Sequence, residues 1–286
     1  MRRHLGVVSA TAVVVGEVIG VGIFLTPAGM ARALGSPALL LAVWLGMGIA
    51  TLAGAVCFAE LAARFPSAGG LYVFLRQAYG ARLAFLFGWM SLLVIDPGLT
   101  AVLATGLAEY LGYVVGFQGW TIRLVAIGAI LLLAAANMLG VRLAAGLLRG
   151  LTILKLGLLV FLVGWGMLGG LGDWSNFVPL VARRPGVPPL MAALPLAMVS
   201  AFFSYAGWWD MSKLAGEVRD PERTIPRALT LGVLVVTAAY VLVSGVFLYL
   251  VPLDRVTSNE AFVAQAGEVL FGPTGGTALA LIVCVA

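Results

Sequence analysis

The chain has 286 residues, of which 62% are hydrophobic and only 10% are charged, with a formal net charge of +5. This composition lies outside the range of soluble domains and indicates an integral membrane protein, whose helices face lipid or one another. Nucleic acid is not indicated as a partner. The basic residues lie in short segments between apolar runs, and the positive-inside rule, by which Lys and Arg concentrate in cytoplasmic loops, explains them better.

Apolar runs long enough to cross a bilayer predict seven spans. In chain order they cover residues 5–34, 39–63, 83–115, 122–138, 147–168, 190–214 and 228–251. The third is longer than the ~20 residues of a perpendicular crossing, so we expect it to tilt or to overhang the membrane. After the second span, residues 64–76 predict a turn and then a short amphipathic helix.

A loop rich in glycine and proline, residues 169–189, separates the first five spans from the rest. The last apolar run, residues 277–286, is too short to cross a bilayer, so we expect the sequence to be a partial chain.

The distribution of basic residues orients the spans. With the N-terminus inside, 11 of the 17 Lys and Arg residues fall in cytoplasmic segments, 5 fall in outer segments, and Lys155 lies within a span. This excess predicts a multi-pass protein of the cell (plasma or inner) membrane with a cytoplasmic N-terminus. Residues 64–82 and 213–227 then face the cytoplasm, and residues 169–189 face outward.

Two spans are interrupted by glycine or small polar residues near their middle. The first span contains GEVIGVGIF at residues 16–24, and the sixth contains FSYAGWWD at residues 203–210. A helix broken inside the membrane leaves backbone N–H and C=O groups without partners, which is tolerated where they line a cavity. Two such breaks at corresponding places indicate the substrate site of a transporter. The alternative is that the glycines only allow close helix packing.

Short motifs keep one order along the chain. They are Gly16-x-x-Ile19-Gly20-x-Gly22-Ile23-Phe24, Glu60-Leu61-x-x-x-Phe65-Pro66-x-x-Gly69-Gly70-x-Tyr72, Asn137-x-x-Gly140-Val141-Arg142 with Lys155, and Phe203-x-Tyr205-x-Gly207-Trp208 followed by Glu217-x-x-x-Pro221-x-Arg223-x-x-Pro226. Together they resemble the amino acid–polyamine–organocation (APC) superfamily, and within it the L-type and related bacterial amino acid permeases.

The resemblance implies an all-α integral membrane protein with the LeuT-type inverted-repeat fold, in which helices 1 and 6 are broken. Residues 1–286 then form a single transmembrane domain, with the first five-helix repeat in residues 1–170. Residues 190–286 form a partial second repeat that is truncated in helix 8.

The function that the resemblance implies is amino acid transport by alternating access, either as proton-coupled symport or as exchange. A non-transporting amino acid sensor, or a polyamine or cationic amino acid exchanger on the same fold, stays open. An enzyme is not expected, because the single histidine, His4, and the isolated acids form no catalytic constellation. No metal or other cofactor is expected.

The resemblance places the substrate at the two breaks. The expected site residues are Val18, Ile19, Gly20, Val21, Gly22, Ile23, Phe203, Ser204, Ala206 and Gly207. The half-helix that restarts at residues 21–23 offers N–H groups and a positive dipole end to the substrate carboxylate. The helices that end near residues 19 and 204 offer carbonyls to its ammonium, and Phe203 closes over it. Such backbone recognition fixes the substrate class but not its member.

Charged residues inside the spans are candidates for coupling. In proton-coupled relatives the residue equivalent to Lys155 lies where sodium binds in others, so Lys155 is expected either to exchange a proton during transport or to brace the structure. Glu17 either faces a cationic group of the substrate or carries a proton. Asp96, just before Pro97, is a second intramembrane acid and can instead cap local backbone. Glu60 is expected to pair with a neighbouring arginine.

The expected partners are an amino acid, the lipid bilayer and protons. L-type relatives that bind a glycoprotein heavy chain use an outer-loop cysteine between spans 3 and 4. Residues 111–121 contain no cysteine, and Cys57 and Cys284 both lie in apolar runs, so no disulfide-linked heavy chain is expected.

Overall fold

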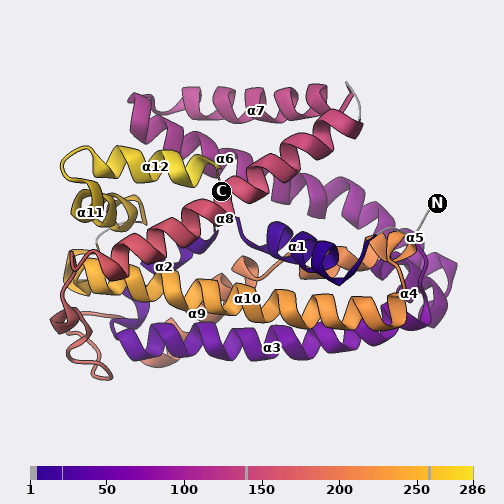
Figure 1. Ribbon diagram of the computed structural model, residues 1–286, viewed down its shortest axis with the longest axis horizontal. Helices are drawn as coiled ribbons and strands as arrows, with labels where there is room; N and C mark the ends of the chain where they lie inside the picture. Colours follow the sequence, from indigo (N-terminus) through magenta and orange to yellow (C-terminus); the bar gives the residue numbers. More distant parts are fainter. Residues whose placement is uncertain (1–4, 21, 139–140, 257–258, 286) are drawn as a thin grey trace. The chain divides into compact units, whose positions relative to one another are not determined.

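The computed structural model describes residues 5–20, 22–138, 141–256 and 259–285, and within these ranges it contains helices and no strands. In chain order (Figure 1) the elements are α1 (Val7–Val18), α2 (Gly22–Leu34), α3 (Pro37–Arg64), α4 (Leu71–Tyr79), α5 (Ala81–Met90), η1 (Ser91–Ile95), α6 (Asp96–Val115), α7 (Trp120–Met138), α8 (Val141–Leu168), η2 (Trp174–Phe177), α9 (Leu190–Ser204), η3 (Trp208–Glu217), α10 (Pro221–Leu250), η4 (Leu253–Arg255), α11 (Asn259–Phe271) and α12 (Gly275–Val285).

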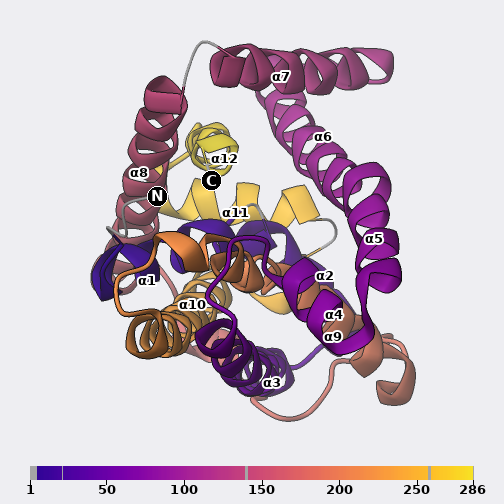
Figure 2. The same cartoon turned by 90° about the vertical axis from the view of Figure 1, so that its right-hand side faces the viewer.

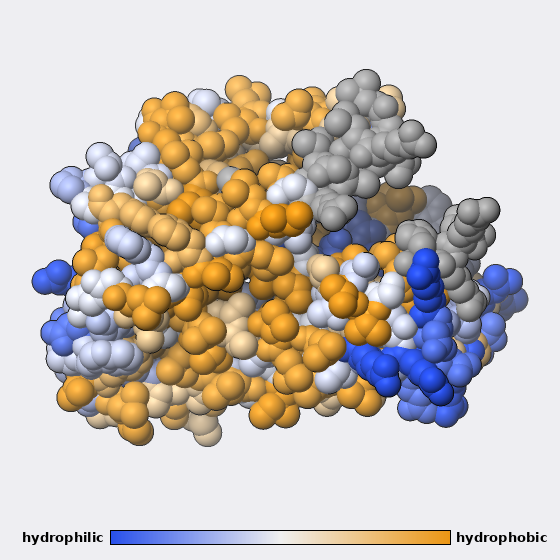
Figure 3. Space-filling model, viewed as in Figure 1, coloured by the Kyte–Doolittle hydropathy of each residue, from blue (hydrophilic) through white to orange (hydrophobic). Residues whose placement is uncertain are grey.

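Six helical segments of the described residues are long and apolar enough to cross a membrane, and α1 with α2 would make a seventh. The face in Figure 3 is accordingly dominated by hydrophobic side chains, with hydrophilic residues gathered at its margins. The predicted class, an all-helical multi-pass membrane protein, is confirmed at this level.

The predicted spans correspond to helices, with three differences. Helix α8 begins at Val141, six residues before the predicted start of the fifth span. Helix α10 begins at Pro221, seven residues before the predicted start of the seventh span at residue 228. Helix α11 was not predicted, because polar residues interrupt its apolar pattern.

The long third span consists of α5, a π-helical turn η1 and α6. The N–H of Asp96 bonds back to the carbonyl of Ser91, which is the wide hydrogen-bonding pattern of a π-helix. Pro97, which follows, has no N–H to donate, so the regular helical ladder is interrupted at this point.

The chain divides into two compact units, each built from three segments. The first contains Met1–Gly20, Ala42–Asp96 and Met198–Val241, and the second contains Val21–Leu41, Pro97–Ala197 and Leu242–Ala286.

In the first unit, α3 and the start of α10 run side by side (Figures 1 and 2). The start of α1 is joined to the end of η3 by a short parallel bridge. The N–H of Leu5 donates to the carbonyl of Glu217 over 3.1 Å, and the N–H of Arg219 donates to the carbonyl of Leu5 over 2.9 Å.

In the second unit, α6 and α7 pack through an alanine cluster of Ala104, Ala108 and Ala126. Helix α8 meets α11 through aromatic contacts, because the ring of Phe161 stacks on Trp165 and on Phe271. The indole N–H of Trp165 also donates to the carbonyl of Leu270 over 3.3 Å.

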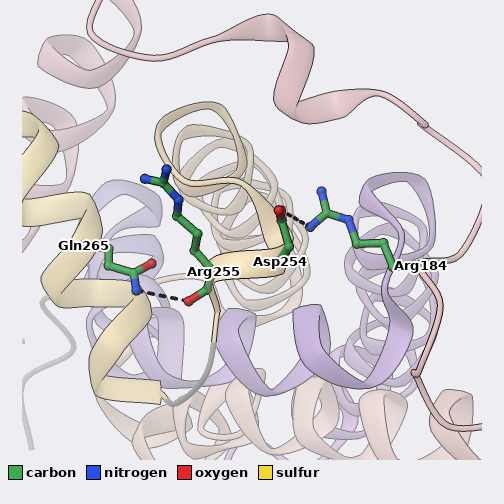
Figure 4. Close-up of polar contacts among 4 residues, drawn as sticks. All are labelled: Arg184, Asp254, Arg255 and Gln265. Carbon is green, nitrogen blue, oxygen red and sulfur yellow. Dashed lines mark hydrogen bonds and ion pairs between the residues drawn. The ribbon is translucent and has the colours of Figure 1, made fainter.

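The loop of residues 169–189 is tied to three helix ends of the second unit. Arg183 donates to the carbonyls of Ala33 and Leu34, at the end of α2, over 3.1 and 2.9 Å. Arg184 pairs with Asp254 of η4 at 2.5 Å (Figure 4). At the end of α10, the Tyr249 carbonyl accepts hydrogen bonds from the loop residues Asp173 and Asn176, both over 2.9 Å.

Candidate functional site

The first break lies between α1 and α2. Helix α1 ends at Val18, and Ile19 leaves the helix with an extended backbone while its N–H still bonds to the Val15 carbonyl. Val18 and Ile19 are buried, at 5% and 1% exposure. A helix C-terminus leaves its last carbonyls without intrahelical donors, so the carbonyls at this point of the chain need donors from elsewhere.

The second break lies between α9 and η3. Helix α9 ends at Ser204, and Gly207 has a φ of +108°, a left-handed conformation that favours glycine. The chain then continues as the 3-10 helix η3. One carbonyl near the break is already engaged, since that of Phe203 accepts a hydrogen bond from the N–H of Ala206 over 3.1 Å.

The hydroxyl of Tyr240, on α10, joins the two breaks. It lies 3.1 Å from the carbonyl oxygen of Val18 and also within hydrogen-bonding reach of the carbonyl oxygen of Ser204. Tyr240 is completely buried. A phenol carries a single proton, so it can satisfy only one of these two acceptors fully, and each carbonyl keeps lone pairs for another donor.

A cluster of aromatic side chains in the first unit holds Tyr240 in place. Trp44 and Tyr205 lie against its ring, with centroid distances of 4.6 and 5.0 Å. Tyr205 is fixed in turn, because its hydroxyl lies 3.0 Å from both the Trp44 carbonyl and the hydroxyl of Thr237. Gly48 makes room for this arrangement, since a Cβ there would lie 2.6 Å from the Thr237 hydroxyl.

Helix α1, before the first break, also lies directly against Gly207, at the second break. A Cβ on Gly207 would lie 3.0 Å from the carbonyl oxygen of Glu17, in the last turn of α1. The glycine therefore serves both the left-handed turn and the close approach of α1.

The other expected site residues occupy different environments. Gly20 lies between α1 and α2, and Ala206 lies in the turn after α9, both partly exposed. Phe203 is 70% exposed and contacts the ring of Phe202. Gly22 and Ile23 begin α2 in the second unit, where Ile23 is 1% exposed. Val21 lies outside the described residues.

The structure brings together several charged residues of the first unit. Lys213 of η3 lies 2.9 Å from Asp210 and also interacts electrostatically with Asp96 and Glu17. Lys155 lies on α8 in the second unit and is partly exposed. As predicted, Glu60 pairs with an arginine, at 2.5 Å from Arg64.

Sequence reasoning missed Tyr240 and gave Lys213 no role beyond its charge. Tyr240 lies within an apolar run, 222 residues from Val18, and no local pattern connects the two. Within the described residues there is no group of three or more His, Cys, Asp or Glu that suits a metal ion.

Comparisons with known proteins show the family. Residues 5–286 match the model of the amino acid permease family. The serine/threonine exchanger SteT of Bacillus subtilis is 29% identical over 286 residues, covering 100% of this chain and 64% of the relative. The human b(0,+)-type amino acid transporter 1 is 31% identical over 95% of this chain and 55% of its own length.

The mouse large neutral amino acids transporter small subunit 2 is also 31% identical, over 95% of this chain and 52% of its own length. The chain thus spans about half to two thirds of the length of these relatives. All three are transporters or exchangers, not enzymes. The chain belongs to the amino acid permease family.

Proposed function

We propose that this protein moves amino acids across the membrane by alternating access, with the substrate bound at the breaks of the first and sixth spans. The observation that carries the proposal is the Tyr240 hydroxyl, which lies within reach of the Val18 and Ser204 carbonyls at once. Acceptors from two interrupted helices thereby meet at one point, as recognition of a substrate ammonium requires.

The chemistry of such a site selects the class of substrate. An ammonium donates three hydrogen bonds, and carbonyls at helix C-termini carry negative dipole ends that favour it. The N-terminus of α2, at Gly22 and Ile23, suits the substrate carboxylate for the opposite reason. Neither contact depends on the substrate side chain. The names of the relatives accordingly cover serine, threonine and large neutral amino acids.

The wider arrangement forms part of the same proposal. The protein adopts the LeuT-type inverted-repeat fold, with a cytoplasmic N-terminus and with residues 169–189 on the outer side. Lys155 takes the coupling role, exchanging a proton during the transport cycle. Exchange of one amino acid for another is the alternative to this proton coupling, and it is favoured by the similarity to the serine/threonine exchanger of Bacillus subtilis.

Reconstitution tests the function. The complete gene product in proteoliposomes is expected to take up radiolabelled L-serine or L-leucine. Stimulation by internal amino acid identifies exchange, and stimulation by an inward proton gradient identifies symport. A protein that is thermally stabilised by amino acids but takes none up is a sensor, and this result would refute transport. Absence of both effects would refute the proposed site as well.

A further inference from the structure

The exposed side of α10 carries two arginines at one end of an apolar surface. Arg223 and Arg227 lie four residues apart in the first two turns, so they share one face of the helix. The same face continues through Leu231, Leu234 and Val235, at spacings of three or four residues. All five side chains are exposed. These five residues form the α10 stripe.

The two arginines of the α10 stripe are not neutralised by an acid. Within the part of the chain that the structure describes, neither takes part in an ion pair. Glu222 is one position before Arg223, and so about 100° around the helix, and Asp220 lies before the helix begins. Two like charges four residues apart destabilise a helix. An anion bound between the arginines relieves this repulsion.

A second exposed stripe in the same unit ends differently. Helix α3 runs beside the start of α10 (Figures 1 and 2) and exposes Leu45, Ile49 and Val56. At its end this α3 stripe reaches Glu60 and Arg64, which pair at 2.5 Å. Both stripes therefore lead from apolar side chains to arginine. The arginine of α3 has its own acid, whereas those of the α10 stripe are left to bind an anion from outside the chain.

An apolar surface that ends in two arginines fits a phospholipid. Acyl chains cover apolar side chains, and the phosphate accepts hydrogen bonds from guanidinium groups. Four residues of helix rise about 6 Å, so a single headgroup can reach both arginines. A headgroup with a net negative charge binds basic residues at the membrane surface more strongly than a zwitterionic one does.

We propose that the α10 stripe is a binding site for an anionic phospholipid. The headgroup lies between Arg223 and Arg227, and the acyl chains lie along Leu231, Leu234 and Val235. Residues 213–227 are predicted to face the cytoplasm, so the lipid comes from the cytoplasmic leaflet, whose surface is negative. This inference goes beyond the proposed function, because it does not depend on which solute the protein moves.

Brominated lipids locate the site. The complete gene product is reconstituted in phosphatidylcholine, and the fluorescence of the parent protein is subtracted from that of each variant. In Leu231→Trp, the new tryptophan is expected to be quenched more by phosphatidylglycerol brominated on its acyl chains than by phosphatidylcholine brominated in the same way. Ile49→Trp, on the α3 stripe, is the matched control and is expected to be quenched equally by both lipids.

Two results of this measurement would overturn the proposal. Equal quenching of Leu231→Trp by the two lipids would show that the α10 stripe does not select the anionic headgroup. Absence of quenching by either lipid would show that another part of the complete gene product, or a second copy, covers the stripe.

Substitutions test the arginines in the Leu231→Trp background. Arg223→Gln and Arg227→Gln are each expected to lower the preference for phosphatidylglycerol about fivefold, and both together remove it. Lysine at both positions keeps the charges and retains the preference. Arg64→Gln leaves it unchanged, because Arg64 is already paired with Glu60. If the double glutamine variant does not fold, the single variants carry the test. A preference that both single variants retain, or that Arg64→Gln loses equally, would contradict the proposal.

Competition separates a lipid from a soluble anion. Glycerol phosphate and inorganic phosphate share the chemistry of the headgroup but have no acyl chains. Neither is expected to reduce the quenching of Leu231→Trp by brominated phosphatidylglycerol beyond the effect of sodium chloride at equal ionic strength. Displacement by either would show a site for free phosphate and would rule out the lipid.

Discussion

At the scale of single residues, the hydroxyl of Tyr240 offers one proton to two carbonyl oxygens, those of Val18 and Ser204. Its hydroxyl is the only polar atom of a side chain that is otherwise packed against Trp44 and Tyr205. Removing the hydroxyl therefore changes the hydrogen bonding of the Val18 and Ser204 carbonyls but leaves the packing of the ring intact.

Tyr240→Phe is expected to destabilise the protein by about 1–3 kcal/mol, the cost of leaving a buried acceptor without its donor. It is also expected to weaken amino acid binding, since the two carbonyls lose the group that fixes their spacing. Thermal melts with and without L-leucine measure both effects. Tyr72→Phe, at a residue that is 37% exposed, serves as the control. Equal ligand-induced shifts in wild type and Tyr240→Phe would contradict the binding role.

The two breaks predict different tolerance to alanine. At Gly207, a Cβ meets the Glu17 carbonyl oxygen at 3.0 Å and φ is +108°, so we expect Gly207→Ala to lose about 1–3 kcal/mol through backbone strain alone. At Gly20, a Cβ would meet nothing within 4 Å, so Gly20→Ala is expected to melt close to wild type. Melting temperatures of the two variants in detergent test this order, and equal losses would show that neither the left-handed turn nor the contact with α1 requires glycine at position 207.

Lys155 carries a prediction about coupling. If it exchanges the transported proton, Lys155→Ala in the complete gene product abolishes uptake driven by a proton gradient and retains amino acid binding. Binding is measured by ligand-induced thermal shift, so that loss of folding is recognised. Survival of gradient-driven uptake in this variant would exclude Lys155 as the proton carrier.

At the scale of elements, the loop of residues 169–189 is tied to α2 and η4 of the second unit through two neighbouring arginines, and to the end of α10 through Asp173 and Asn176. Arg183 donates to the carbonyls that end α2, where a positive charge also suits the helix dipole. Arg184 forms an ion pair with Asp254, which is 72% exposed. We therefore expect the hydrogen bonds of Arg183 to stabilise the attachment of the loop more than the exposed ion pair of Arg184 does.

We expect Arg183→Gln to increase hydrogen exchange across residues 169–189, because carbonyls at the end of α2 lose their donors. Arg184→Gln is expected to cost about 1 kcal/mol or less, as exposed ion pairs do. If both variants exchange like wild type, the arginines do not hold the loop.

The Arg184–Asp254 pair adds a dependence on pH. Its own backbone N–H and the Arg184 guanidinium lower the pKa of Asp254 from the ordinary value of 3.8. A lowered pKa contributes stability above the unfolded value, and this contribution is lost as the pH falls through the lowered value. Wild type and Arg184→Gln should therefore differ in melting temperature at neutral pH and converge at pH values below 3.8.

At the scale of the whole molecule, sequence predicts those features that depend on long apolar runs or on glycine. The spans and both interruptions follow from these patterns, and the structure contains both interruptions. Helix α11 escaped prediction because it buries Phe262, Ala266 and Leu270 on one face and carries polar residues elsewhere, so no long apolar run marks it. The meeting of Tyr240 with Val18 and Ser204 depends on tertiary packing, which local periodicity does not encode.

The topology of the chain gives the last prediction. Three predicted spans, held by α5–α6, α7 and α8, lie between residue 67 and residue 175. If all three cross, these two residues lie on opposite sides of the membrane, and the excess of basic residues predicts that residue 67 faces the cytoplasm. Ser67 and Ser175 are both exposed, so a cysteine at either position is accessible to a reagent.

In a background with Cys57 and Cys284 replaced by serine, an impermeant maleimide added to intact cells should label Ser175→Cys. It should label Ser67→Cys only after the membrane is opened. Labelling of both from outside would show that one of the three segments does not cross, and the reverse pattern would show an inverted orientation.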